Sequence, residues 1–79
     1  MKAVLVRKAE QVSLWWLGGS EYTVDLHRDG IRTTWSGPPA LVRQAMASEL
    51  CRPDAAPGAV TVFRDLTRIA DSTARGAVT

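Results

Sequence analysis

The fold of this chain is decided by residues 12–36, VSLWWLGGSEYTVDLHRDGIRTTWS. Apolar and polar residues alternate through most of this stretch, and breaks fall at Gly18-Gly19 and at Asp29-Gly30. Alternation with a period of two is typical of a strand that buries one side, and such breaks are typical of chain reversals. The stretch therefore predicts three antiparallel strands joined by two tight turns.

The lengths of the two turns follow from the requirement that apolar residues share one face of the sheet. A two-residue turn at 29–30 and a three-residue loop over 18–20 both satisfy it. The inner face then carries Val12, Leu14, Trp16, Tyr22, Val24, Leu26, Thr33 and Trp35. The outer face carries Trp15, Leu17, Asp25, His27, Arg32 and Thr34.

Two adjacent tryptophans, Trp15 and Trp16, lie in the first of these strands. Successive side chains of a strand point to opposite faces, so the two indoles cannot share a side. A chain of 79 residues has little material with which to cover both faces of a sheet. We therefore expect a large aromatic side chain on a surface that a partner can reach.

The segments on either side of the meander complete the predicted domain. The apolar run over 3–6 predicts a further strand, buried on both sides or central in the sheet, before a polar turn over 8–11. Gly37-Pro38-Pro39 opens a helix with Ser36 near its cap, and Arg52-Pro53 ends it.

Both predicted helices have an apolar side. On a helical wheel the first gathers Leu41, Val42, Ala45, Met46 and Leu50. Glu49 falls inside this arc, either as a frayed last-turn residue or as a carboxylate aimed at an inner-face arginine or tyrosine. The stretch 59–63 has β-branched character and suits a fifth strand. The wheel favours a helix instead, from Thr61 or Arg64 to Thr73, with Gly76 as its stop. Its polar side carries Thr61, Arg64, Asp65, Arg68 and Asp71.

These elements predict a single α+β domain over residues 1–75. An antiparallel meander of about four strands carries one or two helices on one face, and residues 76–79 form a frayed tail.

The composition of the chain bears on its charge and on the cellular compartment in which we expect it. Ten Lys and Arg against eight Asp and Glu give a net charge of +2, with acids and bases interleaved along the chain. A single cysteine, Cys51, excludes an internal disulfide, so a cytoplasmic setting is the simplest expectation. We expect Cys51 to be a partly buried small apolar residue, or an activated thiol beside Arg52. We expect no signal peptide and no membrane span.

No catalytic, cofactor-binding or metal-binding motif stands out, and we expect no enzymatic activity and no cofactor. His27 is the only histidine, and Asp25 shares its strand face. A solvated surface histidine is the simpler interpretation than a general base oriented by that carboxylate.

The strongest functional candidate is a protein-binding site on the outer face. An aromatic anchor and arginines within a polar ring are typical of protein-binding hot spots. The predicted site comprises Trp15, Leu17, Asp25, His27, Arg28 and Arg32. Two alternatives remain open: the second helix covers this face, or the same face of another copy covers it in a homodimer.

The outline of three strands followed by a helix is similar to the arm-binding domain of phage tyrosine integrases, which lays a sheet on DNA. That resemblance implies a nucleic-acid-binding module and a sheet face dense in Arg and Lys. Here Arg28 and Arg32 are offset by Asp25 and Asp29, which makes nucleic acid an unfavourable partner. HicB-type antitoxins have a similar outline, but the chain shows no DNA-binding second half.

The chain also resembles the small anti-CRISPR proteins of phages and mobile elements. The shared traits are its length, the meander from Val12 to Ser36 with its Arg28-Asp29-Gly30 turn, the Gly37-Pro38-Pro39 entry into a helix, and the lack of catalytic residues. The resemblance implies an inhibitor that binds a subunit of a CRISPR effector, with type I surveillance complexes as the first candidates, and blocks access to target DNA. Members that imitate DNA are acidic, so this basic chain would have to cover a protein surface.

Overall fold

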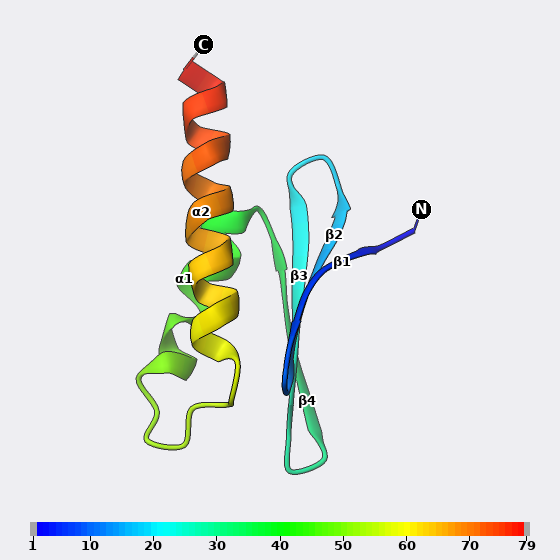
Figure 1. Ribbon diagram of the computed structural model, residues 1–79, viewed down its shortest axis with the longest axis vertical. Helices are drawn as coiled ribbons and strands as arrows, with labels where there is room; N and C mark the ends of the chain where they lie inside the picture. Colours follow the sequence, from blue (N-terminus) through cyan, green and yellow to red (C-terminus); the bar gives the residue numbers. More distant parts are fainter. Residues whose placement is uncertain (1, 79) are drawn as a thin grey trace.

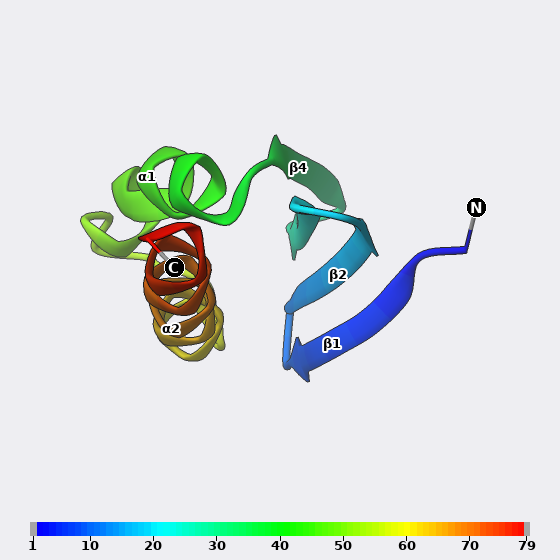
Figure 2. The same ribbon diagram turned by 90° about the horizontal axis from the view of Figure 1, so that it is seen from above.

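The computed structural model describes residues 2–78 of the chain. It confirms the predicted α+β class, with four antiparallel strands in the order β1-β2-β3-β4 and two helices on one face of the sheet (Figures 1 and 2). The elements are β1 (Val4–Ala9), β2 (Val12–Gly18), β3 (Glu21–Arg28), β4 (Ile31–Gly37), α1 (Pro39–Leu50) and α2 (Ala59–Val78).

The register of the meander agrees with the prediction from apolar matching. Val24 lies opposite Trp35 across β3 and β4, and Trp16 lies opposite Tyr22 across β2 and β3. The predicted three-residue loop over 18–20 is wrong in detail. Gly18 pairs with Glu21, which leaves a two-residue turn, and a bulge between Trp16 and Gly18 absorbs the extra residue.

The core lies between the inner face of the sheet and the two helices. Four residues from β2 and β3 meet residues from α1, from α2 and from the loop that joins the helices. Its buried apolar members are Val12, Leu14, Val24, Leu26, Val42, Met46, Ala56, Ala59, Val62 and Leu66. All are at most 5% exposed, so this one layer supplies the burial that stabilises the domain.

The predicted position of the first strand is wrong. β1 continues to Ala9, and the turn that follows is confined to Glu10-Gln11. The strand order places β1 at the edge of the sheet rather than at its centre, and Val4, Leu5 and Val6 remain 50%, 45% and 44% exposed. An unbroken apolar run does not distinguish a central strand from an edge strand, because strand order depends on the other strands.

α1 faces the core with only part of the apolar arc that the helical wheel gave. Val42 and Met46 are buried as predicted, but Leu41 is 59% exposed and Ala45 is also exposed. The buried side also includes Pro39 and Glu49, the latter inside the predicted arc. The positions of the apolar residues on a helical wheel therefore did not give the rotation of this helix correctly.

The N-terminus of α1 lacks the predicted cap. Pro38 occupies the cap position, and no side chain bonds to the first turn. The Oγ of Ser36 instead lies 2.7 Å from the Oγ1 of Thr23, across β3 and β4. Strand pairing thus uses the hydroxyl that was expected at the helix.

The last element is a helix throughout. α2 begins at Ala59, so the alternative of a fifth strand over 59–63 is wrong, and the helix starts earlier than Thr61. It also passes through Gly76, the predicted stop, and reaches Val78. Thr79, the last residue of the predicted tail, lies outside the described residues.

Asp65 belongs to the buried side of α2, contrary to the wheel. Its side chain is 7% exposed, and Arg7 of β1 reaches it with two hydrogen bonds, Nε to Oδ2 at 2.7 Å and Nη2 to Oδ1 at 3.3 Å. Arg68, one turn further along α2, also pairs with Asp65. Because two guanidinium groups satisfy the carboxylate, it can be buried, and the pair ties α2 to β1.

Candidate interaction face

The outer face of the sheet is uncovered in the described part of the chain. Both helices lie on the opposite side, as the view from above shows (Figure 2). The alternative that the second helix covers this face is therefore wrong. Adjacent strands bring its side chains together in register: Leu5 beside Trp15, Trp15 beside Thr23, and Asp25 beside Thr34.

One end of this face is apolar and is centred on Trp15. The indole is partly buried between Leu5 of β1, itself 45% exposed, and Thr23 of β3. Leu17, a predicted site residue, is partly exposed at the bulge where β2 meets the turn. Leu5 was not among the predicted site residues, because the first strand was expected to be buried or central and no neighbour was assigned to it.

The other end of the face is polar and slightly hollowed. A shallow depression of about 420 Å³ lies beside Trp15 and is lined by Lys8, Glu10, Gln11, Ser13, Trp15, Asp25 and His27. Trp15 therefore lines the same depression as charged and neutral polar side chains. Such an apolar centre with a polar margin is suited to contact with a protein surface.

The carboxylate of Asp25 is held by residues of β4. Arg32 Nη2 donates to Asp25 Oδ2 at 2.9 Å, and Thr34 Oγ1 donates to Asp25 Oδ1 at 2.9 Å. His27 is exposed, as the surface interpretation predicted, and lies opposite Arg32 rather than in a hydrogen bond with Asp25. The arrangement therefore neutralises the carboxylate and fixes the Arg32 side chain on the outer face.

Trp16 lies on the inner face, so the two adjacent indoles point to opposite sides as predicted. It is nevertheless 38% exposed, because it lies near the β2–β3 turn, where it is paired with Tyr22 and Val4 rather than with the helices. Its Nε1 donates to the carbonyl of Gly19 at 2.9 Å. Neither tryptophan of the pair is therefore fully buried.

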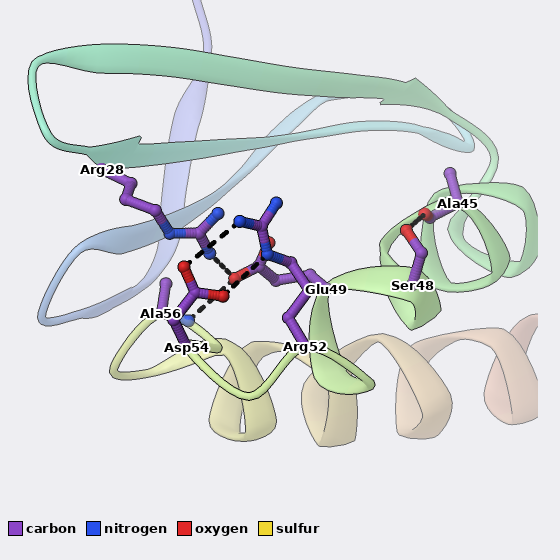
Figure 3. A network of polar contacts seen from close by, with 7 residues as sticks. All are labelled: Arg28, Ala45, Ser48, Glu49, Arg52, Asp54 and Ala56. Atoms are coloured by element: carbon purple, nitrogen blue, oxygen red, sulfur yellow. Dashed lines mark hydrogen bonds and ion pairs between the residues drawn. The ribbon is translucent and has the colours of Figure 1, made fainter.

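Arg28 does not belong to the outer face, which corrects the predicted site. It shares the inner side of β3 with Leu26, and its guanidinium forms an ion pair with Glu49 of α1 (Figure 3). Glu49 is 5% exposed, and its Oε2 accepts a hydrogen bond of 2.8 Å from the backbone N–H of Ala56. Of the two interpretations of Glu49, the carboxylate aimed at an inner-face arginine is correct.

A second, exposed ion pair lies next to this buried one (Figure 3). Arg52 donates from Nε to Asp54 Oδ1 at 2.9 Å and from Nη2 to Asp54 Oδ2 at 3.2 Å. These hydrogen bonds lower the pKa of the Asp54 carboxyl, and they raise the pKa of the Arg52 guanidinium. Solvent screens the pair, so it orders the loop between the helices more than it stabilises the fold.

Other candidate chemistry is remote from the outer face. Cys51 is exposed at the end of α1, so the prediction of partial burial is wrong. Within residues 2–78, no three His, Cys, Asp or Glu side chains gather in a group that could hold a metal ion. The same residues include no helix that combines the length and the apolar character needed to cross a membrane.

No protein-family model, curated protein or solved structure matches the chain.

Proposed function

We propose that the protein is a non-enzymatic binding protein that docks on a partner protein through the outer face of its sheet. The observation that carries this proposal is the position of Trp15, beside Leu5 on a sheet face without a covering helix. Tryptophan is the residue type most enriched among side chains that dominate binding energy at protein interfaces. A rigid sheet presents it with little loss of conformational entropy on binding.

The charges of this face favour a protein over a nucleic acid. Lys8, His27 and Arg32 lie on it, but Arg32 is bound to the carboxylate of Asp25. A protein that binds duplex DNA through its phosphates needs several free cations on one surface. Trp15, with Arg32 bound to Asp25 and Lys8 unbound within residues 2–78, is better suited to a protein surface that has both apolar and charged groups.

The most specific form of the proposal follows from the resemblance to anti-CRISPR proteins. In that form the protein acts in the cytoplasm, binds a subunit of a type I CRISPR effector and blocks its access to target DNA. The direct test is target-DNA binding by a purified type I surveillance complex, measured with increasing amounts of this protein. Inhibition that saturates near one protein per complex supports this form, and unchanged DNA binding rejects it.

Replacing Trp15 by alanine is expected to weaken partner binding at least thirtyfold. An interface hot spot contributes about 2 kcal/mol or more, and about 1.4 kcal/mol corresponds to a tenfold change in affinity. The partner is isolated by affinity capture from a host lysate, and its dissociation constant is then measured for wild type and variant. Leu41→Ala serves as the matched control, because Leu41 is an exposed apolar residue of the helix layer.

The binding of wild type and of the two variants distinguishes protein binding through the outer face from nucleic-acid binding and from a homodimer. Loss of binding in Trp15→Ala, with unchanged binding in Leu41→Ala and unchanged circular dichroism in both, is the expected result. Equal binding by all three proteins would contradict the proposal. Binding to random duplex DNA that falls steeply with salt would favour the nucleic-acid alternative, and a concentration-dependent dimer lost in Trp15→Arg would favour a homodimer through this face.

A further inference from the structure

The free edge of β1 is an apolar strand edge with no partner among the described residues. Val4, Leu5 and Val6 form a run of three residues that are 50%, 45% and 44% exposed. The other edge strand, β4, has a single exposed large apolar residue, Ile31 at 67%, followed by Arg32 and polar residues over 33–34. β1 lies at the margin of the sheet, and the chain that leads into it runs away from the helices (Figures 1 and 2). An exposed apolar edge is a template for the addition of another strand.

The register identifies the backbone groups that this edge presents. The N–H of His27 donates to the carbonyl of Gln11 at 3.0 Å, so the odd-numbered residues of β3 and β2 bond to each other. In an antiparallel ladder the bonding direction alternates along the strand, so the even-numbered residues of β2 bond to β1. Leu5 and Lys8 lie opposite odd-numbered residues of β2, and their N–H and C=O groups therefore point to the free edge.

The charge along this edge selects the kind of strand that fits. Residues 2–9 contain three cations, Lys2, Arg7 and Lys8, and no acid. Arg7 is bound to Asp65, whereas Lys2 and Lys8 are exposed. Pairing with β1 of a second copy would bring two sets of cations together, and like charges across a strand pair are destabilising. An acidic segment would instead bring opposite charges together across the strand pair.

The side chains of an added strand would find apolar surface on both faces of the sheet. On the outer face, a residue of the added strand opposite Leu5 would contact Leu5, which itself lies beside Trp15 of β2. On the inner face, a groove of about 490 Å³ beside β1 and α2 has an apolar part, formed by Val6, Tyr22 and Ile69. Its other lining residues are polar: Arg7, Asp65, Arg68, Ser72 and Thr73. Main-chain hydrogen bonds with alternate side-chain contacts are the mode of recognition known as strand addition.

We propose that β1 binds an extended, acidic segment of a partner protein as a fifth strand of the sheet. This inference rests on the proposed function, since it assigns the binding mode of the partner that contacts the outer face. Apolar side chains of the segment contact Leu5 and the Val6 groove. Its Asp or Glu residues lie near Lys2 and Lys8.

The test is selection of a random twelve-residue peptide library, displayed on phage, against the immobilised full chain. Selected peptides are expected to alternate apolar residues and to be enriched in Asp and Glu. Their affinity is then compared for Lys8→Pro and Lys8→Ala. Both variants lack the ammonium group, but only proline removes the edge N–H, and proline is tolerated where that N–H faces solvent.

At least tenfold weaker peptide binding by Lys8→Pro than by Lys8→Ala supports strand addition. Amide exchange provides a second measurement on the wild type, in which bound peptide is expected to slow exchange at Leu5 and Lys8. Peptides without acidic enrichment, equal affinity for the two variants, unchanged exchange at both amides, or no peptide above background would each overturn the inference. The proposed function is judged separately, because it depends on the effect of Trp15→Ala on the captured partner.

Discussion

Replacing Glu49 by alanine is expected to lower the free energy of unfolding by about 3–5 kcal/mol, as is typical when one partner of a buried ion pair is removed. The change leaves the Arg28 guanidinium, whose side chain is 19% exposed, without its carboxylate. It also leaves the backbone N–H of Ala56 without its acceptor. Urea denaturation followed by circular dichroism measures the effect. Because a domain of this size has a small free energy of unfolding, the Glu49→Ala variant would be largely unfolded near physiological temperature.

The neighbouring pair provides the control for Glu49. Asp54→Ala removes a carboxylate that also binds an arginine, but this pair is exposed, so the urea midpoint is expected to stay within error of wild type. Replacing both Arg28 and Glu49, by methionine and leucine, should recover much of the loss, because no unpaired charge is then buried. A Glu49→Ala midpoint equal to that of Asp54→Ala would show that the buried pair does not hold α1 to the sheet.

Replacing Gly58 by alanine is expected to destabilise the fold by roughly 3 kcal/mol or more, because strain and overpacking combine at this position. Gly58 has a φ of +92°, and a Cβ atom there would lie 2.0 Å from the carbonyl oxygen of Ala9. The start of α2 can therefore approach the end of β1 only if residue 58 has no side chain. Thermal and urea unfolding of the variant measure the loss.

Gly30→Ala is the matched control for this position. Gly30 has a φ of +78°, but a Cβ atom there meets nothing within 4 Å, so only the backbone strain of about 1–2 kcal/mol is expected. The difference between the two variants isolates the steric contact with Ala9. Equal destabilisation by both substitutions would contradict the close packing of α2 on β1.

The local rules of strands predicted the meander well from the sequence. Alternation and turn position fixed which residues of β2, β3 and β4 oppose one another, since a slip of one residue would have placed Val24 and Leu26 on the wrong face. The opposite orientation of Trp15 and Trp16 followed from the same period of two. These features depend on residues that are close together in the sequence, so the sequence of one chain is enough to predict them.

Features that depend on long-range contacts were not predictable in this way. The burial of Asp65 requires Arg7, which is 58 positions away, and the burial of Glu49 requires Arg28. The helical wheel placed Asp65 on the polar side of its helix, and although it placed Glu49 inside the apolar arc, it could not choose between a frayed residue and a paired carboxylate. The edge position of β1, and with it the contact of Leu5 with Trp15, likewise depends on the order of all four strands.

The most direct test of binding through the outer face is an NMR titration of the labelled chain with its captured partner. The Leu5 methyl signals and the Trp15 indole N–H signal report on the outer face, and the Leu41 methyl signals report on the helix layer. We predict that the first two shift or broaden on binding while the signals of Leu41 do not change. Shifts at Leu41 with unchanged signals from Leu5 and Trp15 would contradict binding through the outer face.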